Sequence, residues 1–287
     1  MANTAATTPL AAPTKARRVS RPWGQWSLRA VALIYLSVML LLPLAAVLND
    51  GLSGGLSGLW ADITRPAAWA ALRLSLWTAA VMTVINTIMG VLTAYVLVRY
   101  KFPGRSFLNA IIDIPFAIPT LVAGLMLVVL YGPQTAVGGF LKQQFGWQII
   151  FAPPGIILAL LFVSFPFVVR TVQPVLMEID TDQEDAAATL GASGWRTFRR
   201  VLFPAIAPAV ISGALLSFAR ALGEFGSIIV VAGNFPLRSQ TAAVYVLSQI
   251  ESDNQRAASA VSIVLLTLAF SLVFVVDFIQ RRQEHDA

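Results

Sequence analysis

Residues 178–204 read EIDTDQEDAAATLGASGWRTFRRVLFP and form the one long charged stretch between hydrophobic segments. Elsewhere the chain is built for lipid: of its 287 residues 57% are hydrophobic and only 12% are charged, and the mean hydropathy is +0.75. An ordinary soluble domain has about 25% charged residues. The composition therefore predicts an integral membrane protein. A folded, amphipathic piece kept at the surface of such a protein indicates a place where something docks.

Six apolar stretches are long enough to cross a bilayer, because a hydrocarbon core about 30 Å thick needs roughly 20 helical residues. We therefore expect an all-α, polytopic membrane protein with about six transmembrane helices. The transmembrane domain is expected at 27–280, between a disordered tail at 1–26 and a short tail at 281–287, with a loop at 173–204 after the fourth span. The predicted spans are 29–48, 72–98, 107–131, 155–172, 205–232 and 260–279.

Two of these spans leave alternatives open. Residues 44–46, Leu-Ala-Ala, resemble the processing site of a signal peptide, although the apolar run there is longer than the usual signal core and favours a retained helix. Gly223, Gly226 and Gly233 interrupt the fifth span. A seventh, short or re-entrant segment near 228–248 is therefore the alternative to six spans.

The basic residues divide unequally between the two sides of the membrane. An even number of spans places both termini on one side, and that side carries most of the Lys and Arg residues. By the positive-inside rule both termini are expected in the cytoplasm. The formal net charge of +6 then reflects topology, and no nucleic-acid interface is expected. The basic residues expected on the outer side are Arg65, Arg73, Lys142, Arg238 and Arg256.

Several chemistries lack the residues they need. The chain has no cysteine, and its one histidine, His285, lies in the charged tail, which leaves no histidine or thiolate metal site and no histidine-centred triad. A Walker A loop needs Gly-Lys-Ser/Thr, but no glycine precedes Lys15, Lys101 or Lys142. We therefore expect no catalytic residue, metal or cofactor on this chain. Any energy that it uses must come through a partner or a gradient.

The charged stretch predicts two short helices joined by a turn. Thr181 and Glu184 match a capping box, in which each side chain bonds the other residue's backbone N–H, so a helix should start there and run through the following alanines. Residues 191–194, Gly-Ala-Ser-Gly, predict a tight turn, and Pro204 opens the next span. An ordinary connector between two membrane helices would show the same pattern. The second helix is amphipathic, with Trp195, Phe198, Val201 and Leu202 opposite Arg196, Thr197, Arg199 and Arg200.

Charged residues and prolines also occur inside the predicted spans. Arg220 lies about 22 Å into the fifth span at 1.5 Å per residue, and Glu224 follows one turn later. Charges at this depth must face protein or water, and their spacing allows an ion pair. The pair is either structural or part of a pathway in which Arg220 attracts an oxyanion. In the third span Asp113, Pro115 and Pro119 predict a kinked helix.

The charged stretch resembles the EAA loop of ABC importer permeases, whose pattern reads E-A-A, three residues, G, nine residues, I, one residue, L-P. The matching residues are 185–187, Asp-Ala-Ala, then Gly191, then 201–204, Val-Leu-Phe-Pro; aspartate replaces the usual glutamate and phenylalanine a leucine. In that family the loop sits in a groove of a separate ATPase subunit. The resemblance implies an ATPase-coupling role for Glu184, Asp185, Ala186, Ala187, Leu190, Gly191, Ala192, Phe198 and Pro204.

Three further segments resemble the CysT-type permeases of sulfate and thiosulfate importers. They are PFAIPT at 115–120, FPFVVRTVQPVL at 165–176 and SFARALGEFG at 217–226, and the similarity covers roughly residues 70–280. The last segment is also similar to molybdate permeases and to CysW-type subunits. A permease for another oxyanion, such as molybdate, is therefore the alternative.

The resemblance implies a type I importer (MetI-like) permease fold and a place in the inner membrane of a bacterial cell. It implies three kinds of partner: a second permease chain of the CysW type, ATPase subunits that hold ATP and Mg, and an extracytoplasmic sulfate-binding protein. Two other classes remain as rivals. A gradient-driven secondary transporter needs a midplane proton or ion relay, for which Glu224 is the only carboxylate in place, and a membrane enzyme needs a catalytic constellation that the chain lacks.

Overall fold

The computed structural model describes residues 22–286, with side chains from 26 to 278. Every regular element in this part is a helix, which confirms the all-α class. The chain divides into two compact units, residues 1–46 and 47–287, and each is described by itself. Most of the predicted tail at 1–26 lies outside the described residues, but the first helix already begins at Pro22, before the boundary that we expected.

The N-terminal segment is one continuous helix, long and apolar enough to cross a membrane from Trp26 to Gly51. It is divided by a π-helical turn at Ser37–Leu41, which separates α1 (Pro22–Leu36) from α2 (Leu42–Gly51). The turn has a local cause in Pro43, which has no N–H and whose ring crowds the carbonyl group four residues earlier. This helix coincides with the first predicted span.

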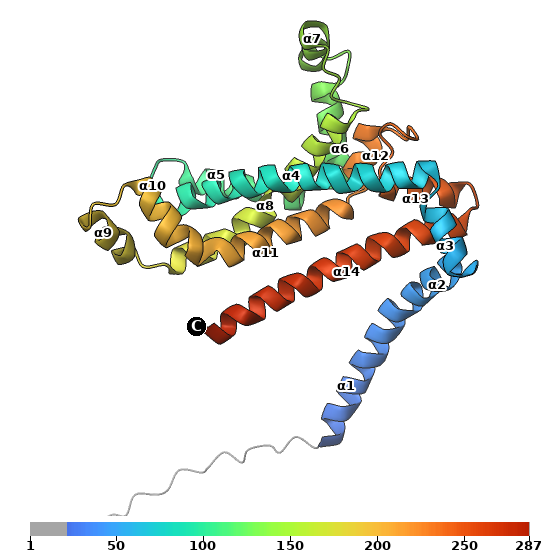
Figure 1. The fold of residues 1–287 in the computed structure, drawn as a ribbon, viewed down its shortest axis with the longest axis horizontal. Helices are drawn as coiled ribbons and strands as arrows, with labels where there is room; N and C mark the ends of the chain where they lie inside the picture. Colours follow the sequence, from blue (N-terminus) through green and yellow to red (C-terminus); the bar gives the residue numbers. More distant parts are fainter. Residues whose placement is uncertain (1–21, 287) are drawn as a thin grey trace, which may run out of the picture. The chain divides into compact units, whose positions relative to one another are not determined.

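Four long helices build the bundle of the second unit: α4, α8, α11 and α14. Helix α4 packs against α8, α8 against α11, and α11 against α14 (Figure 1). The short helices α9 and α10 lie at one end of this bundle, and α3 and α13 lie at the other. The helices are α3 (Gly55–Ile63), α4 (Pro66–Arg99), α5 (Arg105–Ala117), α6 (Thr120–Tyr131), α7 (Ala136–Phe145), α8 (Pro153–Glu178), α9 (Asp182–Thr189), α10 (Gly194–Thr197), α11 (Phe203–Leu222), α12 (Gly226–Ala232), α13 (Ala242–Glu251) and α14 (Gln255–Asp286).

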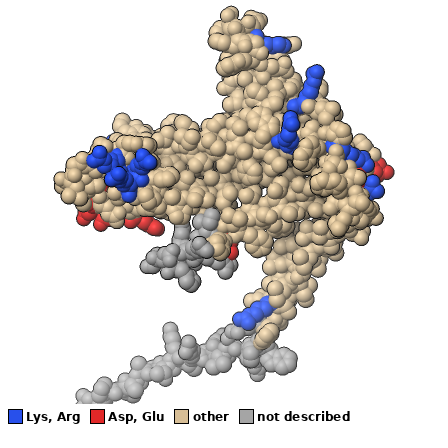
Figure 2. Space-filling model, viewed as in Figure 1, with Lys and Arg blue, Asp and Glu red and all other residues tan. Residues whose placement is uncertain are grey.

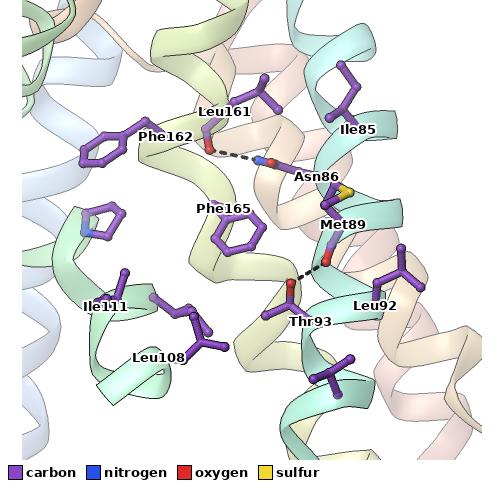
Figure 3. A pocket seen from close by; sticks show the side chains of 13 residues that line it. Ile85, Asn86, Met89, Leu92, Thr93, Leu108, Ile111, Leu161, Phe162 and Phe165 are labelled. Atoms are coloured by element: carbon purple, nitrogen blue, oxygen red, sulfur yellow. Dashed lines mark hydrogen bonds between the residues drawn. The ribbon is translucent and has the colours of Figure 1, made fainter. Parts of the chain in front are cut away.

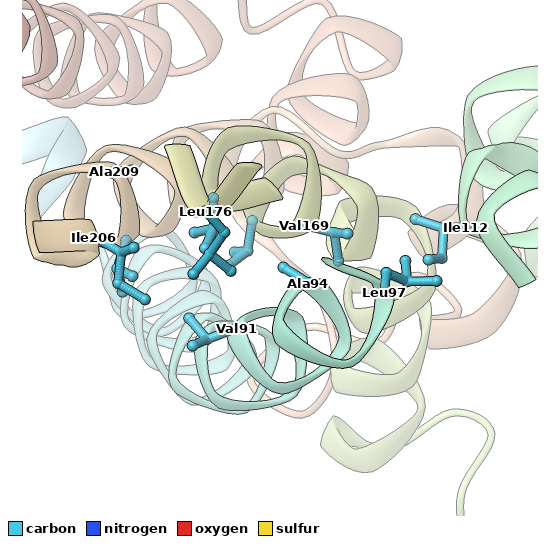
Figure 4. Close-up of a cluster of buried hydrophobic side chains, with 11 residues drawn as sticks. Val91, Ala94, Leu97, Ile112, Val169, Leu176, Ile206 and Ala209 are labelled. Carbon is cyan, nitrogen blue, oxygen red and sulfur yellow. The ribbon is translucent and has the colours of Figure 1, made fainter. Parts of the chain in front are cut away.

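The core nearest to α9 and α10 is formed by α4, α8 and α11, with α5 at its edge (Figure 4). Its side chains are aliphatic and of medium or small size, and most are completely buried. Lipid tails are as apolar as leucine, so close packing rather than water exclusion must hold such helices together. The labelled core residues are Val91, Ala94, Leu97, Ile112, Val169, Leu176, Ile206 and Ala209.

Two glycines allow the three central helices to approach one another closely. A Cβ atom on Gly90 of α4 would lie 2.8 Å from the Cβ atom of Val168 on α8. A Cβ atom on Gly213 of α11 would lie 3.1 Å from the Cα atom of the same valine. Val168 therefore fills the space that both glycines leave open, and the three helices meet at this point.

The third predicted span, 107–131, is not a single helix. It consists of α5 and α6, whose axes are bent by 109° at a short break. Pro119 explains the break, because a residue that precedes proline is forced out of the helical region, and Ile118 has extended backbone angles of φ −85° and ψ 127°. The expected kink is thus a bend of more than a right angle. The described chain has five spanning helices, or six if this bent pair counts as one.

The fifth predicted span, 205–232, is also corrected. Its helix starts earlier, since α10, a π-helical turn at Phe198–Leu202 and α11 form one helix from Gly194 to Leu222. It then ends at Gly223, and α12 packs separately against α6 and α8. Neither α12, with 7 residues, nor α13, with 10 residues, is long enough to span a bilayer, so the seventh segment near 228–248 consists of short helices.

The helix ends differ from the predicted loop and tail boundaries. Helix α8 continues to Glu178, so the first residues of the loop predicted at 173–204 are helical, and α14 continues to Asp286 through the tail predicted at 281–287. Hydrophobicity marks where lipid ends, but a helix often continues beyond it into water. The span limits in a sequence therefore underestimate the helix lengths.

Candidate functional site

The charged loop has the predicted helix, turn and helix, but its second helix is longer than expected. Helix α9 ends at Thr189, and Gly191 adopts a left-handed φ of +80°, which glycine permits without strain. The chain then enters the helix that begins at Gly194 and continues through α11. Pro204 therefore lies inside this helix, just after a π-helical turn like the one before Pro43.

The predicted capping box is wrong. Thr181 has helical backbone angles, φ −63° and ψ −22°, and its side chain makes no capping hydrogen bond. Instead, the carboxylate of Asp180 accepts a hydrogen bond of 3.0 Å from the backbone N–H of Asp182. Glu184 does not reach back to Thr181, because Arg99 at the end of α4 holds its carboxylate at 2.6 Å.

Two side chains of the last turns of α4, Arg99 and Tyr95, attach the loop. Besides its ion pair with Glu184, Arg99 donates a 3.3 Å hydrogen bond to the carbonyl oxygen of Ile179, just beyond the end of α8. Tyr95, one turn earlier, meets Phe198 edge to face with ring centroids 5.8 Å apart. Phe198 in turn stacks on Trp195 at 5.7 Å. Both helices of the loop are therefore fixed to α4.

The predicted coupling residues separate into an outer and an inner set. Leu190 is 88% exposed and Trp195 is 70% exposed, so two large apolar side chains stand in solvent at the end of the bundle. Figure 2 shows basic side chains on the facing surface of this end and acidic side chains along its lower edge. Asp185, Ala186, Leu190, Gly191 and Pro204 are exposed, whereas Glu184, Ala187, Ala192 and Phe198 are partly buried.

Arg220 and Glu224 form the ion pair that their spacing allows, with 2.7 Å between a guanidinium nitrogen and Glu224 Oε2. Glu224 lies in the break between α11 and α12 and is 2% exposed. Its other oxygen accepts 2.9 Å hydrogen bonds from both the backbone N–H and the hydroxyl group of Ser227. The carboxylate therefore also caps α12, a role that the sequence analysis missed although Ser227 follows at the right distance for a cap.

Arg220 is less completely paired than its partner. Its side chain is 31% exposed, and within the described residues only one of its nitrogens has a protein partner, Glu224. A guanidinium group has five N–H donors. Most of its donors therefore remain available to another acceptor.

A second cluster, which sequence analysis did not identify, lies between α5 and α8. Arg170 binds both carboxylate oxygens of Asp113, at 2.7 and 2.6 Å. It also donates to the side chains of Asn109 and Gln173, at 2.8 and 2.7 Å, and to the carbonyl oxygen of Asn109 at 2.8 Å. These contacts use all five donors of Arg170, so this guanidinium group has no donor left for a ligand.

A third ion cluster ties α3 to α14 at the other end of the bundle. Asp62, 1% exposed, pairs with Arg65 at 2.7 Å and with Arg256 at 2.8 Å. The sequence analysis treated both arginines only as topology markers. Nothing in the local sequence links Asp62 to Arg256, since the contact depends on how two distant helices pack.

An apolar groove of about 610 Å³ lies between α4, α5 and α8 (Figure 3). Leu108, Ile111, Phe162 and Phe165 line it, and its polar groups are engaged: Asn86 donates to the carbonyl oxygen of Leu161. No charged residue lines this groove. It therefore suits an apolar occupant and does not suit an oxyanion.

The described residues include no group of three or more Asp, Glu, His or Cys side chains that could hold a metal ion. Two places remain as candidate sites: the loop with exposed Leu190 and Trp195, and Arg220 beside the break after α11. The loop can bind a protein, and Arg220 can attract an anion.

Comparison with known proteins gives relatives over most of the chain. A sulfate transport system permease named as probable in Chlorokybus atmophyticus is 43% identical over 262 residues, which cover 91% of this chain and 90% of that protein. The sulfate transport system permease CysT of Escherichia coli K12 is 39% identical over 251 residues, 88% of this chain and 90% of that protein.

Solved structures support the same fold. A chain of a bacterial alginate ABC transporter aligns with a TM-score of 0.75 at 17% identity, covering 91% of this chain and 94% of that chain. A chain of the MetNI methionine ABC transporter aligns with a TM-score of 0.52 at 20% identity, covering 76% of this chain and 98% of that chain. At these identities the likeness concerns the fold alone.

Residues 86–286, which include the charged loop, the Arg170 cluster and the Arg220–Glu224 pair, match the family described as the inner membrane component of binding-protein-dependent transport systems. This chain is therefore a multi-pass membrane protein that belongs to that family, the permeases of ABC importers.

Proposed function

We propose that this chain is the non-catalytic, membrane-spanning permease of an ATP-driven importer that carries sulfate and thiosulfate into the cytoplasm. The proposed cargo rests on the relatives, because proteins named as sulfate transport permeases match about nine tenths of the chain at 39 to 43% identity. The proposed energy source rests on the docking loop, which exposes Leu190 and Trp195 at one end of the bundle.

The loop is suited to receive a separate ATPase subunit. Large apolar side chains that stand in solvent mark a protein interaction site when polar residues surround them. Asp182, Asp185 and Arg196 surround Leu190 and Trp195 in the sequence and are exposed. In this proposal ATP and Mg stay on the ATPase, and this chain binds no cofactor.

The proposed orientation places α9, α10 and both termini in the cytoplasm. The opposite end, with α3 and α13, would then face outward and receive an extracytoplasmic sulfate-binding protein. A second permease chain, of the CysW type, would complete the pathway in the inner membrane of a bacterial cell. The distribution of Lys and Arg supports this orientation.

Arg220 is the residue that we assign to the anion pathway. Glu224, itself held by Ser227, pairs with Arg220 from one side, while most of the donors of Arg220 remain unpaired within the described residues. An arginine held in place with free N–H groups is well suited to a tetrahedral oxyanion. Its exposed fraction of 31% leaves room for such a ligand to approach.

The Arg220–Glu224 site suits the two alternative functions, molybdate import and proton-driven transport, to different degrees. Molybdate is a tetrahedral dianion like sulfate, so Arg220 would serve both, and the choice between them falls to the binding protein. A proton-driven carrier would need Glu224 to gain and lose protons. Two hydrogen bonds from Ser227 and the ion pair with Arg220 already engage both of its oxygens, which leaves Glu224 poorly placed to relay protons.

The decisive test is uptake of radiolabelled sulfate into proteoliposomes that contain this permease, its permease partner and the ATPase, with the binding protein outside. We expect sulfate uptake only when ATP is enclosed in the vesicles, on the side where the ATPase lies. Thiosulfate should compete with sulfate for uptake, and molybdate should compete more weakly. Uptake that follows a proton gradient without ATP would refute the proposal. Stronger competition by molybdate than by thiosulfate would instead indicate that molybdate is the transported anion.

A further inference from the structure

Two adjacent carboxylates in the docking loop face different surroundings. Asp185 is exposed and has no ion-pair partner among the described residues. Glu184 turns inward and lies 2.6 Å from Arg99, with side chains that are 20% and 12% exposed, respectively. Only Asp185 is therefore available to a partner protein, although both residues belong to the charged start of α9.

Arg99 connects three chain segments through one guanidinium group. It is the last residue of α4, where a positive charge is favourable at the helix C-terminus. Its Nε lies against Glu184 of α9, and a terminal nitrogen donates to the carbonyl oxygen of Ile179 beyond α8. The start of α9 thus depends on Arg99 for its position relative to both long helices.

Tyr95 provides a second attachment on the same face of α4. It lies four residues before Arg99, one helical turn away, and its ring meets Phe198 of the helix that leads into α11. The last turn of α4 therefore holds the first half of the loop by an ion pair and the second half by an aromatic contact.

We propose that the last turn of α4 positions the docking loop, and that the Arg99–Glu184 pair passes the movement of the loop to α4. Arg99 is a positioning residue that does not touch the partner, and Glu184 acts within its own chain. This inference rests on the proposed coupling to an ATPase, and it divides the work of the two carboxylates: Asp185 meets the partner, and Glu184 fixes the loop.

The physical chemistry favours a strong dependence on both members of the pair. The charges are mostly shielded from water, so salt screens them weakly, and removing one member leaves the other charge without its partner. Exchanging the two charges would keep an ion pair, but it would place a carboxylate at the negative end of α4. Exchange should therefore restore the contact in part.

The first experiment measures loop mobility in the full chain alone. Because the chain has no cysteine, Ala188→Cys, an exposed site in α9, carries the only spin label. We expect a sharp increase in label mobility with Arg99→Gln or Glu184→Gln, and a partial return with the exchanged pair Arg99→Glu/Glu184→Arg. Lys101→Gln, an exposed site two residues from Arg99, is the matched control and should not change mobility. An unchanged label in Arg99→Gln would overturn the proposed positioning role.

The second experiment uses the complete transporter in proteoliposomes and measures ATP hydrolysed for each sulfate ion imported. We expect Arg99→Gln and Glu184→Gln to keep the ATPase bound but to raise this ratio at least about fivefold, the lower end of typical coupling between sites. Asp185→Asn should instead weaken ATPase binding without mobilising the label. Loss of ATPase binding in Glu184→Gln would place Glu184 in the interface and refute the inference. A wild-type complex that fails to import sulfate would refute the proposed function, while the spin label would still decide the positioning role.

Discussion

At the scale of single residues, the Arg220–Glu224 pair has unequal members. Glu224 is buried, and its two oxygens accept from three donor groups, so the protein holds the carboxylate in position. Only one nitrogen of Arg220 contacts that carboxylate, and its other nitrogens have no protein partner among the described residues. A purely structural pair would be expected to satisfy both members, as Arg170 and its partners do. The asymmetry therefore favours a pathway role for Arg220.

The first prediction separates that role from a structural one. Arg220→Ala should abolish sulfate uptake, but it also leaves Glu224 as a buried charge without its ion partner, at a cost of about 3–5 kcal/mol. The double variant Arg220→Met/Glu224→Gln removes both charges together and should assemble normally. We expect its uptake to fall by at least about tenfold, which corresponds to 1.4 kcal/mol. Normal uptake in an assembled double variant would leave the pair with a structural role only.

The second prediction concerns the tip of the docking loop. Leu190→Asp should lower the affinity for the ATPase, because it places a charge where an apolar contact must be buried. The fold should be unaffected, since Leu190 is 88% exposed and surface substitutions usually change stability by less than about 0.5 kcal/mol. Co-purification of the ATPase measures the effect.

A matched control for this prediction lies near the opposite end of the bundle. Leu237 is 65% exposed, and its positive φ of 63° is well tolerated by aspartate. Leu237→Asp should therefore leave ATPase binding unchanged. Equal effects of the two substitutions would indicate general damage rather than a docking site.

At the scale of helices, the close approach of α4, α8 and α11 depends on glycine. Gly90 and Gly213 both face Val168, and an added Cβ atom at Gly90 would lie well inside contact distance of that side chain. The positions one turn away on the same face of α4, Asn86 and Ala94, are also buried, so the helix cannot move aside without disturbing them. The bundle must separate locally or the valine must change rotamer.

The third prediction follows from this contact. Gly90→Ala should destabilise the bundle by about 1–3 kcal/mol, the usual cost of overpacking. Gly58→Ala in α3, where an added Cβ atom meets nothing within 4 Å, should be neutral or slightly stabilising because alanine favours helix. Thermal unfolding of both variants in detergent gives the comparison. A lower melting temperature for Gly58→Ala than for Gly90→Ala would contradict it.

Helix positions were predictable from the sequence where hydrophobicity alone decides them. The spans at α4, α8 and α14 are visible as long apolar runs, and the turn at Gly191 follows from its small residues. The sharp bend at Pro119 was expected only as a kink, because a proline marks a break but not the direction that the chain takes afterwards. The capping box failed because Glu184 has a stronger partner in Arg99, which is distant in sequence.

At the scale of the whole molecule, the sequence predicted the class and the family, but not the long-range ion clusters. Arg170 with Asp113, Asp62 with Arg256, and Arg99 with Glu184 each join helices that are far apart in the chain. Such pairs depend on how helices pack, which hydrophobic patterns do not specify. By contrast, Arg220 and Glu224 are one turn apart, and the helix geometry alone was enough to predict their contact.

The fourth prediction concerns membrane orientation. The absence of native cysteine makes single-cysteine labelling clean. Lys142→Cys in α7 should react with an impermeant maleimide in intact cells, whereas Ala188→Cys in α9 should react only after the membrane is opened. Both sites are exposed in the structure, so accessibility depends on the side of the membrane. The reverse labelling pattern would invert the proposed topology.

The helix from Gly194 to Leu222 has a mechanical consequence. It carries Trp195 of the docking loop near one end and Arg220 near the other, about 38 Å apart at 1.5 Å per residue. Across a continuous helix of this length, a tilt of about 5° about the end that carries Trp195 moves Arg220 by about 3 Å, comparable to a hydrogen-bond length. In the proposed transporter, a small movement of the ATPase would thus be enough to form or break the hydrogen bonds between Arg220 and an anion.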